Sequence, residues 1–236
     1  MSGDGFIGVL SKKVVNVAWA YILNNYRCGS MKLKATIIIP FDVERGYLDL
    51  AIKSVERQTY ENIELIVEQG EHSWPTQANR AIEKCTGDII RYLQEDDLLP
   101  DRSIEHTVKF FQENDVDFIH SNAVNFWEDG REQFWVPKSY QHPTLEQMIT
   151  KNRLHGGSVV YRKRCFDERM FDESLWTGEE WEFNMYLLQS GRRIGYMNEF
   201  TYMYRRHDNQ KSLGKNVSQK KRYAAFEEIR NRFRVK

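Results

Sequence analysis

The sequence has few cysteines, no net charge and no long apolar run, and each of these absences narrows the possible protein classes. Its 236 residues include three cysteines, which are widely spaced and form no CxxC pair. That spacing argues against a zinc site, and the odd number argues against a disulfide framework. We therefore expect a protein of a reducing compartment, the cytoplasm.

The charge balance argues against a global attraction to nucleic acid, and we expect no nucleic-acid partner. Thirty-four basic residues match thirty-four acidic ones, so no net field steers the protein toward an anionic polymer. The charged residues after position 204 are nevertheless mostly basic. A basic segment of this kind indicates contact with an anion, such as phosphate or a membrane surface, or else a solvated helix face.

Residues 6–23 are apolar-rich, but Lys12, Lys13 and Asn16 interrupt them. The stretch is too polar and too short to span a bilayer. Its apolar residues repeat at helical spacing, which predicts an amphipathic helix that lies on a membrane, packs on the body, or has no role. Peripheral membrane contact would then come from this helix and the basic C-terminus. We expect three parts: an N-terminal extension at 1–30, the main domain at 31–215, and a basic helix packed on it at 216–236.

Short apolar runs alternate with helical repeats from residue 34 onward. The runs at 35–40, 63–67 and 89–93 are continuous, as is typical of buried parallel strands. Strand, helix, strand, helix, strand with short connections predicts a parallel sheet with right-handed crossovers. Ligands bind such sheets at the carboxyl ends of the strands. Polar segments stand at all three ends, at residues 41–45, 68–71 and 94–97.

The second half of the chain has a less regular pattern. We expect helices over residues 145–150, 179–189 and 220–233. We expect strands over residues 117–126, 133–136, 157–161 and 194–197. The sequence shows no internal repeat and no low-complexity linker, so one α/β domain accounts for most of it.

Gln94, Glu95, Asp96 and Asp97 directly follow the third predicted strand. Three adjacent carboxylates repel one another, and a bound cation relieves that repulsion. Oxygen ligands suit Mg²⁺ or Mn²⁺, whose coordination shells are usually completed by substrate phosphates. The alternative is a solvated acidic loop ahead of a helix that begins near Asp101, where negative charge favours the helix dipole.

Several further motifs occur in a fixed order along the chain. The first part carries TIIIP at 36–40, AIKSVERQTY at 51–60, NIELIV at 62–67, QANRAI at 77–82 and GDII at 87–90. The last part carries FDE at 171–173, GEEWE at 178–182 and YRRH at 204–207. In this order the motifs resemble glycosyltransferase family 2, the inverting family with the GT-A fold, over about residues 34–212.

The resemblance implies an α/β fold of the GT-A type, with a Rossmann-like, mostly parallel central sheet flanked by helices. It implies an inverting transfer of a sugar from a nucleotide-diphosphate donor, a UDP-sugar, to a hydroxyl group. The acceptor can be a glycan, a lipid-linked sugar or a protein, in polysaccharide or glycan biosynthesis. The implied cofactor is Mn²⁺ or Mg²⁺, which stabilises the charge of the leaving diphosphate.

We expect the donor to be bound by residues at the strand ends and in the late motifs. These are Pro40, Phe41, Asp42, Glu44, Glu68, Asn79, Gln94, Glu95, Asp96, Gly156, Gly157 and Arg205. The paired glycines permit close backbone approach to a ligand, or else form a tight turn.

Two positions depart from the family pattern. Glu68 stands where the family usually has an Asp that meets the nucleoside, and Gln94 replaces the first acid of the metal motif. We therefore expect metal binding to rest on Asp97, with Asp96 or Glu95 helping. The resemblance adds His207 as a metal ligand or diphosphate contact, although a lone histidine is often structural.

An inverting transfer needs one carboxylate that takes the proton of the acceptor hydroxyl as its oxygen attacks the anomeric carbon. Glu180 matches the acid of the family's Glu-Asp pair and is the predicted base, with Glu179 as the alternative. Side chains of adjacent helical residues diverge, so we expect only one of them to face the site. Trp181 is either a platform for an acceptor sugar or part of the core.

Two other functions fit parts of the pattern. A nucleotidyltransferase also binds metal-bound phosphates, but residues 41–45 lack the glycine-rich, basic loop expected after the first strand. A degenerate GT-A domain that acts as a binding or scaffold module would explain the two departures from the family pattern. Such a module would not need Asp97, Glu180 and His207 together.

Overall fold

The computed structural model describes residues 32–70, 73–207, 210 and 218–234. The predicted extension at 1–30, including its amphipathic helix, lies outside the described residues. The chain divides into two compact units, and the second, Leu33–Lys236, carries the fold. No helix in the described part of this unit is long and apolar enough to cross a membrane.

Seven strands in the described part of the chain form one sheet. They are β1 (Ala35–Phe41), β2 (Ile63–Gln69), β3 (Ile89–Tyr92), β4 (Phe118–Phe126), β5 (Glu132–Trp135), β6 (Val160–Arg162) and β7 (Ile194–Arg205). Their order is β2-β1-β3-β6-β4-β5, and β7 pairs with β4 off this path. Parallel pairs join β1 to β2 and β3, and β4 to β7, whereas β6 is antiparallel to both β3 and β4.

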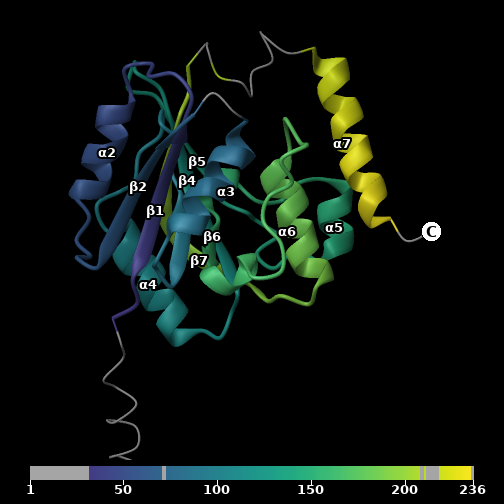
Figure 1. Cartoon of the computed structure of the whole chain (residues 1–236), viewed down its shortest axis with the longest axis horizontal. Helices are drawn as coiled ribbons and strands as arrows, with labels where there is room; N and C mark the ends of the chain where they lie inside the picture. The colour runs from purple at the N-terminus through teal and green to yellow at the C-terminus, as the bar shows by residue number, and fades with distance from the viewer. Residues whose placement is uncertain (1–31, 71–72, 208–209, 211–217, 235–236) are drawn as a thin grey trace, which may run out of the picture. The chain divides into compact units, whose positions relative to one another are not determined.

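Helices cover both faces of the sheet (Figure 1). They are α2 (Leu48–Glu56), α3 (Trp74–Lys84), α4 (Ser103–Glu113), α5 (Leu145–Thr150), α6 (Glu179–Gln189) and α7 (Gln219–Phe233). The apolar side chains of β1 alternate between two cores because successive residues of a strand point to opposite faces. Ile37 and Ile39 pack with α2 and α4, whereas Ile38 packs with α3 and α6. This arrangement confirms the predicted α/β sheet flanked by helices.

The C-terminal helix α7 packs on the same side of the sheet as α5 and α6, at the right of Figure 1. Ile229 and Phe233 are buried in the core that contains residues of α3, α5 and α6. The aromatic rings of Trp181 on α6 and Phe226 on α7 meet edge to face, with their centroids 5.6 Å apart. The basic helix is therefore amphipathic, and its apolar face lies on the domain.

The structure corrects two predicted strands. The strand expected at 157–161 is instead a 3₁₀ turn, Gly156–Ser158, followed by the short β6. Ser158 stabilises the turn, because its hydroxyl donates a 2.9 Å hydrogen bond to the carbonyl of His155. The strand expected at 194–197 continues to Arg205, because it pairs with β4 along its whole length across register shifts near Asn122. This longer β7 brings its C-terminal residues next to the acidic motif.

Candidate active site

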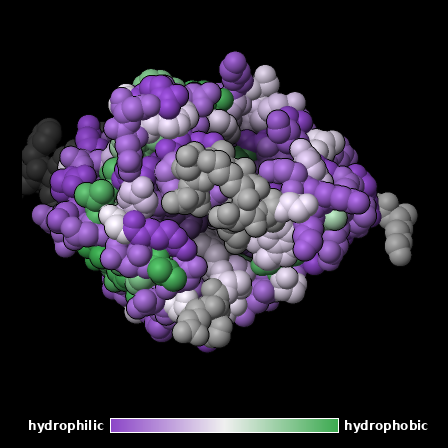
Figure 2. All heavy atoms as spheres, turned by 90° about the horizontal axis from the view of Figure 1, so that it is seen from above, coloured by the Kyte–Doolittle hydropathy of each residue, from purple (hydrophilic) through white to green (hydrophobic). Residues whose placement is uncertain are grey.

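The acidic motif lies at the carboxyl edge of the sheet. The chain enters β1 at the bottom of Figure 1, so the parallel strands end at the top, where the acidic motif follows β3. Figure 2 looks down from above, and the visible residues are mostly hydrophilic. Two adjoining cavities open among these strand ends.

The first cavity, of about 350 Å³, lies between the end of β1, the start of α3 and the acidic motif. Its lining consists of Pro40, Phe41, Asp42, Arg45, Ser73, Trp74, Gln77, Gln94, Glu95, Asp96, His207 and Gln210. The structure thus brings together six of the predicted donor-binding residues and the predicted ligand His207. Cavities of this size bind small molecules and cofactors in other proteins.

The second cavity, of about 690 Å³, lies between the end of α5, the start of α6 and one side of α7. It shares Trp74, Gln94, Asp96 and Gln210 with the first cavity. The two cavities are therefore adjacent, and Asp96 stands where they meet.

Asp97, the residue predicted to carry the metal, faces the protein interior instead. Its side chain is fully buried. Oδ2 accepts a 2.6 Å hydrogen bond from the hydroxyl of Tyr202, and Oδ1 accepts a 2.8 Å bond from the amide of Arg205. Burial, followed by the charge of Asp96, raises the pKa of Asp97 well above its ordinary value. Asp97 therefore anchors the motif to β7, and the expectation that it leads metal binding is corrected.

Asp96 takes the position that we expected for Asp97. Its Oδ2 lies 3.0 Å from Nε2 of His207, and both side chains line the first cavity. Among the described residues, no group of three or more His, Cys, Asp or Glu side chains is placed to hold a metal ion. The chain itself thus offers one oxygen and one nitrogen ligand at this point.

Arg205 contacts the backbone of Asp96 on the side away from the cavities, and it lines neither cavity. Its Nε donates a 2.8 Å hydrogen bond to the carbonyl of Asp96. Its guanidinium lies between the rings of Tyr47 and Phe126, at 4.6 and 4.7 Å from their centroids. The predicted contact of Arg205 with donor phosphate is replaced by a positioning role, because the side chain is buried in the protein.

Glu95 is also largely buried, and it forms an ion pair with Arg45, which pairs in turn with Asp42. Burial raises the pKa of Glu95, and the charge of Arg45 opposes that effect. The pair ties the acidic motif to the segment that follows β1. Glu95 therefore shapes the wall of the first cavity, and its carboxylate is already engaged.

Glu180 lies in the first turn of α6 and lines the second cavity. Its carboxylate packs directly against Gly156, where a Cβ atom would stand 2.5 Å from Oε2. Burial, together with the negative charge of Glu179, raises the pKa of Glu180 to about 8. Glu179 lines the same cavity, so the expectation that only one of the two faces the site is corrected. A carboxyl with a raised pKa in a cleft is suited to proton transfer.

Five predicted donor contacts lie outside both cavity linings: Arg205, described above, and Glu44, Glu68, Asn79 and Gly157. Glu68 is buried and forms a 2.5 Å ion pair with Lys84. Glu44 is exposed and accepts a 2.8 Å hydrogen bond from the amide of Gly46. Gly157 lies under the ring of Tyr202, where a Cβ atom would overlap the ring. Each of these residues is engaged within the protein.

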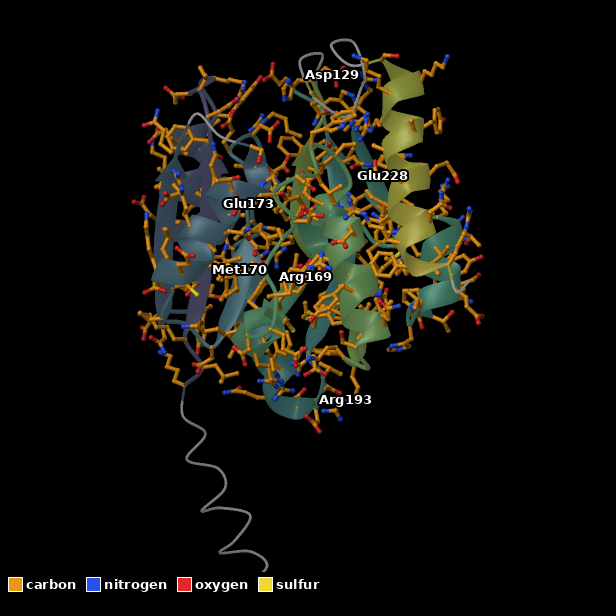
Figure 3. All side chains as sticks on the ribbon, turned by 45° about the vertical axis from the view of Figure 1, so that its right-hand side comes forward. Asp129, Arg169, Met170, Glu173, Arg193 and Glu228 are labelled. Atoms are coloured by element: carbon orange, nitrogen blue, oxygen red, sulfur yellow. The ribbon has the colours of Figure 1, made fainter. Side chains whose placement is uncertain are left out.

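Asn79 and Trp181 also have structural contacts. The Asn79 amide bonds both the amide and the carbonyl of Phe171, and it donates a 2.9 Å bond to Glu173. Glu173 is labelled beside α3 in Figure 3. Asn79 thus ties α3 to the loop ahead of α6. Trp181 is buried, and its Nε1 donates a hydrogen bond to the carbonyl of Met148. It also lines the second cavity, so an acceptor can contact only the part of its ring that faces this cavity.

Trp74 and Tyr202 were missed by the sequence reasoning. Trp74 lines both cavities, and its buried Nε1 has no hydrogen-bond partner among the described residues. Its only signal is a position just before Pro75 at a helix start. Tyr202 gave no signal, because its role depends on the pairing of β7 with β4.

Fold and site together define an α/β domain with two adjoining cavities at the carboxyl edge of its sheet, and comparisons with known proteins narrow that class. Residues 68–170 match the model of glycosyl transferase family 2. This match confirms the resemblance to that family.

The solved structures that resemble the chain include TarS of S. aureus. Residues 1–349 of TarS in complex with UDP-GlcNAc match with a TM-score of 0.65 and 17% identity, over 84% of this chain and 65% of that one. The UDP complex matches with a TM-score of 0.62, 17% identity and the same coverage. A longer TarS structure matches with a TM-score of 0.60 and 18% identity, over 74% of this chain and 37% of that one.

This chain therefore spans less than two thirds of each of these TarS chains. The similarity confirms the predicted GT-A fold. A comparison with curated proteins gives no match.

Proposed function

We propose that the chain is an inverting glycosyltransferase that transfers a sugar from a UDP-sugar to a hydroxyl group. The observation that carries the proposal is the position of Asp96, where the two cavities meet. One cavity has polar walls suited to a nucleotide, and the other holds Glu180. The complexes of TarS with UDP-GlcNAc and UDP, which share this fold, support a uridine donor.

In this proposal the first cavity binds the nucleoside diphosphate. Phe41 and Trp74 give apolar surface for the base, and Gln94 gives an amide for the ribose or the base. Ser73 and Gln77, at the start of α3, add neutral polar groups. A lining with several neutral hydrogen-bonding groups suits the polar edges of a nucleoside.

The residues present fit a divalent cation. Asp96 and His207 provide an oxygen and a nitrogen ligand 3.0 Å apart, and Mn²⁺ accepts both types. Two protein ligands are enough where substrate phosphates and waters complete the shell. Such a cation would neutralise charge on the leaving diphosphate. Asp97 would help to hold Asp96 in place by accepting a hydrogen bond from the amide of Arg205 on β7. The Arg205 side chain would do so by donating to the carbonyl of Asp96.

The second cavity receives the acceptor in this proposal. Glu180 takes the proton of the acceptor hydroxyl. At the same time the hydroxyl oxygen bonds to the anomeric carbon of the donor sugar, and the bond between that carbon and the diphosphate breaks. A single displacement of this kind inverts the anomeric configuration. The raised pKa of Glu180, about 8, makes it a stronger base than an ordinary carboxylate. Gly156 leaves the space in which this carboxylate lies.

Release of free UDP from a panel of UDP-sugars in the presence of Mn²⁺ tests the proposal, together with calorimetry of UDP binding. We expect metal-dependent UDP binding and slow hydrolysis of at least one donor. Glu180→Gln should keep UDP binding and lose turnover. A chain that binds no nucleotide would contradict the donor site, and one that binds UDP without any turnover would favour a binding module.

A further inference from the structure

One face of α7 forms a wall of the second cavity. Arg222, Tyr223, Phe226 and Arg230 of α7 line the cavity. Positions 222, 226 and 230 are four residues apart and therefore lie along one side of the helix. The core-facing residue Ile229 lies on another side. The basic C-terminal helix thus turns part of its charge toward the cleft that holds Glu180.

Three cations gather on this wall. Arg222 and Arg230 come from α7, and Lys151 comes from the end of α5, which packs against α7. Arg222 lies over the ring of Phe226 at 5.6 Å from its centroid, and Arg230 lies over the ring of Trp181 at 5.4 Å. These ring contacts hold the guanidinium groups at the cleft.

Arginines on both sides of α7 pair with carboxylates of the same helix. Outside the cavity lining, Arg232 pairs with Glu228, labelled on α7 in Figure 3, and Arg234 pairs with Glu227. Arg230, in the lining, also pairs with Glu227, but its Nε is buried and has no hydrogen-bond partner in the described part of the chain. A buried donor without an acceptor is costly unless a ligand satisfies it.

The carboxylates of the same cavity come from other elements. Glu179 and Glu180 belong to the start of α6, and Asp96 follows β3. The cleft thus has acidic groups where the proposed chemistry takes place and basic groups on the wall of α5 and α7. Exposed aromatic surface, from Trp176 and Tyr223, borders the basic wall.

We propose that this wall binds an acceptor sugar that carries an anionic group, phosphate or carboxylate, beside the ring presented to Glu180. Guanidinium groups bind both oxyanions with charge-assisted hydrogen bonds. Trp176 and Tyr223 offer aromatic faces for the apolar side of the sugar ring. The inference rests on the proposed transfer to a hydroxyl, and it adds the chemical class of the molecule that carries this hydroxyl.

Three matched glycosides test it: p-nitrophenyl β-glucoside, its 6-phosphate, and p-nitrophenyl β-glucuronide. Their affinities for the full chain are measured by saturation-transfer NMR, with and without UDP. We expect the anionic glycosides to bind at least tenfold more tightly than the neutral one. A gain for the phosphate alone assigns a phosphorylated acceptor, and a gain for the glucuronide alone assigns a uronate. Equal gains assign charge as the shared feature, and equal affinity for all three overturns the proposal.

Variants locate the binding site. Arg222→Gln with Arg230→Gln should remove the preference for the anionic glycosides, and Lys151→Gln, at an exposed position, should reduce it. Arg234→Gln, on the same helix but outside the cavity lining, should leave it unchanged. Thermal unfolding checks that each variant is folded. A preference that survives in the folded double variant and in Lys151→Gln overturns the assignment to this wall.

The outcome can be separated from that of the proposed function. UDP binding and donor hydrolysis report on the first cavity and on Glu180, whereas glycoside binding without UDP reports on the α5 and α7 wall. If the anionic glycosides bind but UDP does not, the proposed transferase function is wrong and the cleft remains an anion-binding site. If UDP binds and is released from a donor but the anionic glycosides show no preference, the transferase function stands and the acceptor is neutral.

Discussion

The hydroxyl of Tyr202, near the end of β7, donates a 2.6 Å hydrogen bond to Oδ2 of Asp97, the last residue of the acidic motif. Both side chains are fully buried. The bond joins two segments more than 100 residues apart and turns the last carboxylate of the motif inward. Asp96, one residue earlier, is left on the cavity side.

Tyr202→Phe should therefore destabilise the fold. The substitution removes a hydrogen-bond donor to a buried carboxylate, a loss that typically costs about 1–3 kcal/mol. Urea denaturation measures the change. Tyr186→Phe is the matched control, because its hydroxyl bonds an exposed carboxylate, that of Glu168; we expect a change within about 0.5 kcal/mol. Equal costs for the two variants would contradict the anchoring role of Tyr202.

Asp96→Asn and Asp97→Asn should have opposite consequences. The Asp96 side chain is 23% exposed and faces the cavity, so its loss should abolish Mn²⁺-dependent UDP binding with little effect on stability. Asp97 is fully buried and hydrogen-bonded, so its replacement should lower the unfolding free energy by about 1–3 kcal/mol. Calorimetry with and without Mn²⁺, and urea denaturation, measure the two effects. A stable Asp97→Asn protein without metal-dependent binding would restore Asp97 as the ligand.

The pH dependence of transfer should follow Glu180. Its pKa of about 8 predicts that kcat/KM rises about tenfold per pH unit below that value and levels off above it. Glu179→Gln should move the midpoint to lower pH, because the negative charge of Glu179 helps to raise the pKa. A midpoint that stays in place would show that the two carboxylates do not interact.

The stability of the folded state should also depend on the protonation of Glu180. The folded state keeps Glu180 protonated up to about pH 8, whereas the unfolded chain loses this proton near the ordinary carboxyl pKa of about 4.3. The stability from the neutral carboxyl is thus present at low pH and lost as the pH rises through 8. Glu180→Gln, always neutral, should unfold at a higher temperature than the wild type at pH 9 and at the same temperature at pH 4. An equal difference at both values would place the titration elsewhere.

Alanine at the two glycines of the 3₁₀ turn should separate activity from stability. In Gly156→Ala the new Cβ would stand 2.5 Å from Oε2 of Glu180. A side-chain carboxylate can move away at small cost, but a displacement of about 1 Å typically lowers turnover about a hundredfold. In Gly157→Ala the new Cβ would overlap the buried ring of Tyr202, which should cost about 1–3 kcal/mol. Turnover and urea denaturation distinguish the two, and full activity of Gly156→Ala would exclude Glu180 as the base in this position.

The amino-acid sequence by itself determined the α/β class, the three parallel strands and the acidic motif at the end of β3. These features are local, because continuous apolar runs and helical spacing identify elements wherever the chain packs. The sequence also identified Glu180 and His207 as candidates for the two cavities. It did not predict that Glu68 and Asn79 are engaged within the protein, because Lys84 and Phe171 are brought to them by packing.

Only the tertiary structure decided which carboxylate of the motif faces both cavities. Asp96 and Asp97 are adjacent and chemically alike, and no spacing rule separates them. The choice depends on β7, whose pairing with β4 places Tyr202 and the amide of Arg205 at Asp97. The second cavity depends in the same way on α7, because its wall forms only when Ile229 packs into the core. Contacts between distant segments set both features, and such contacts follow from packing rather than from local sequence.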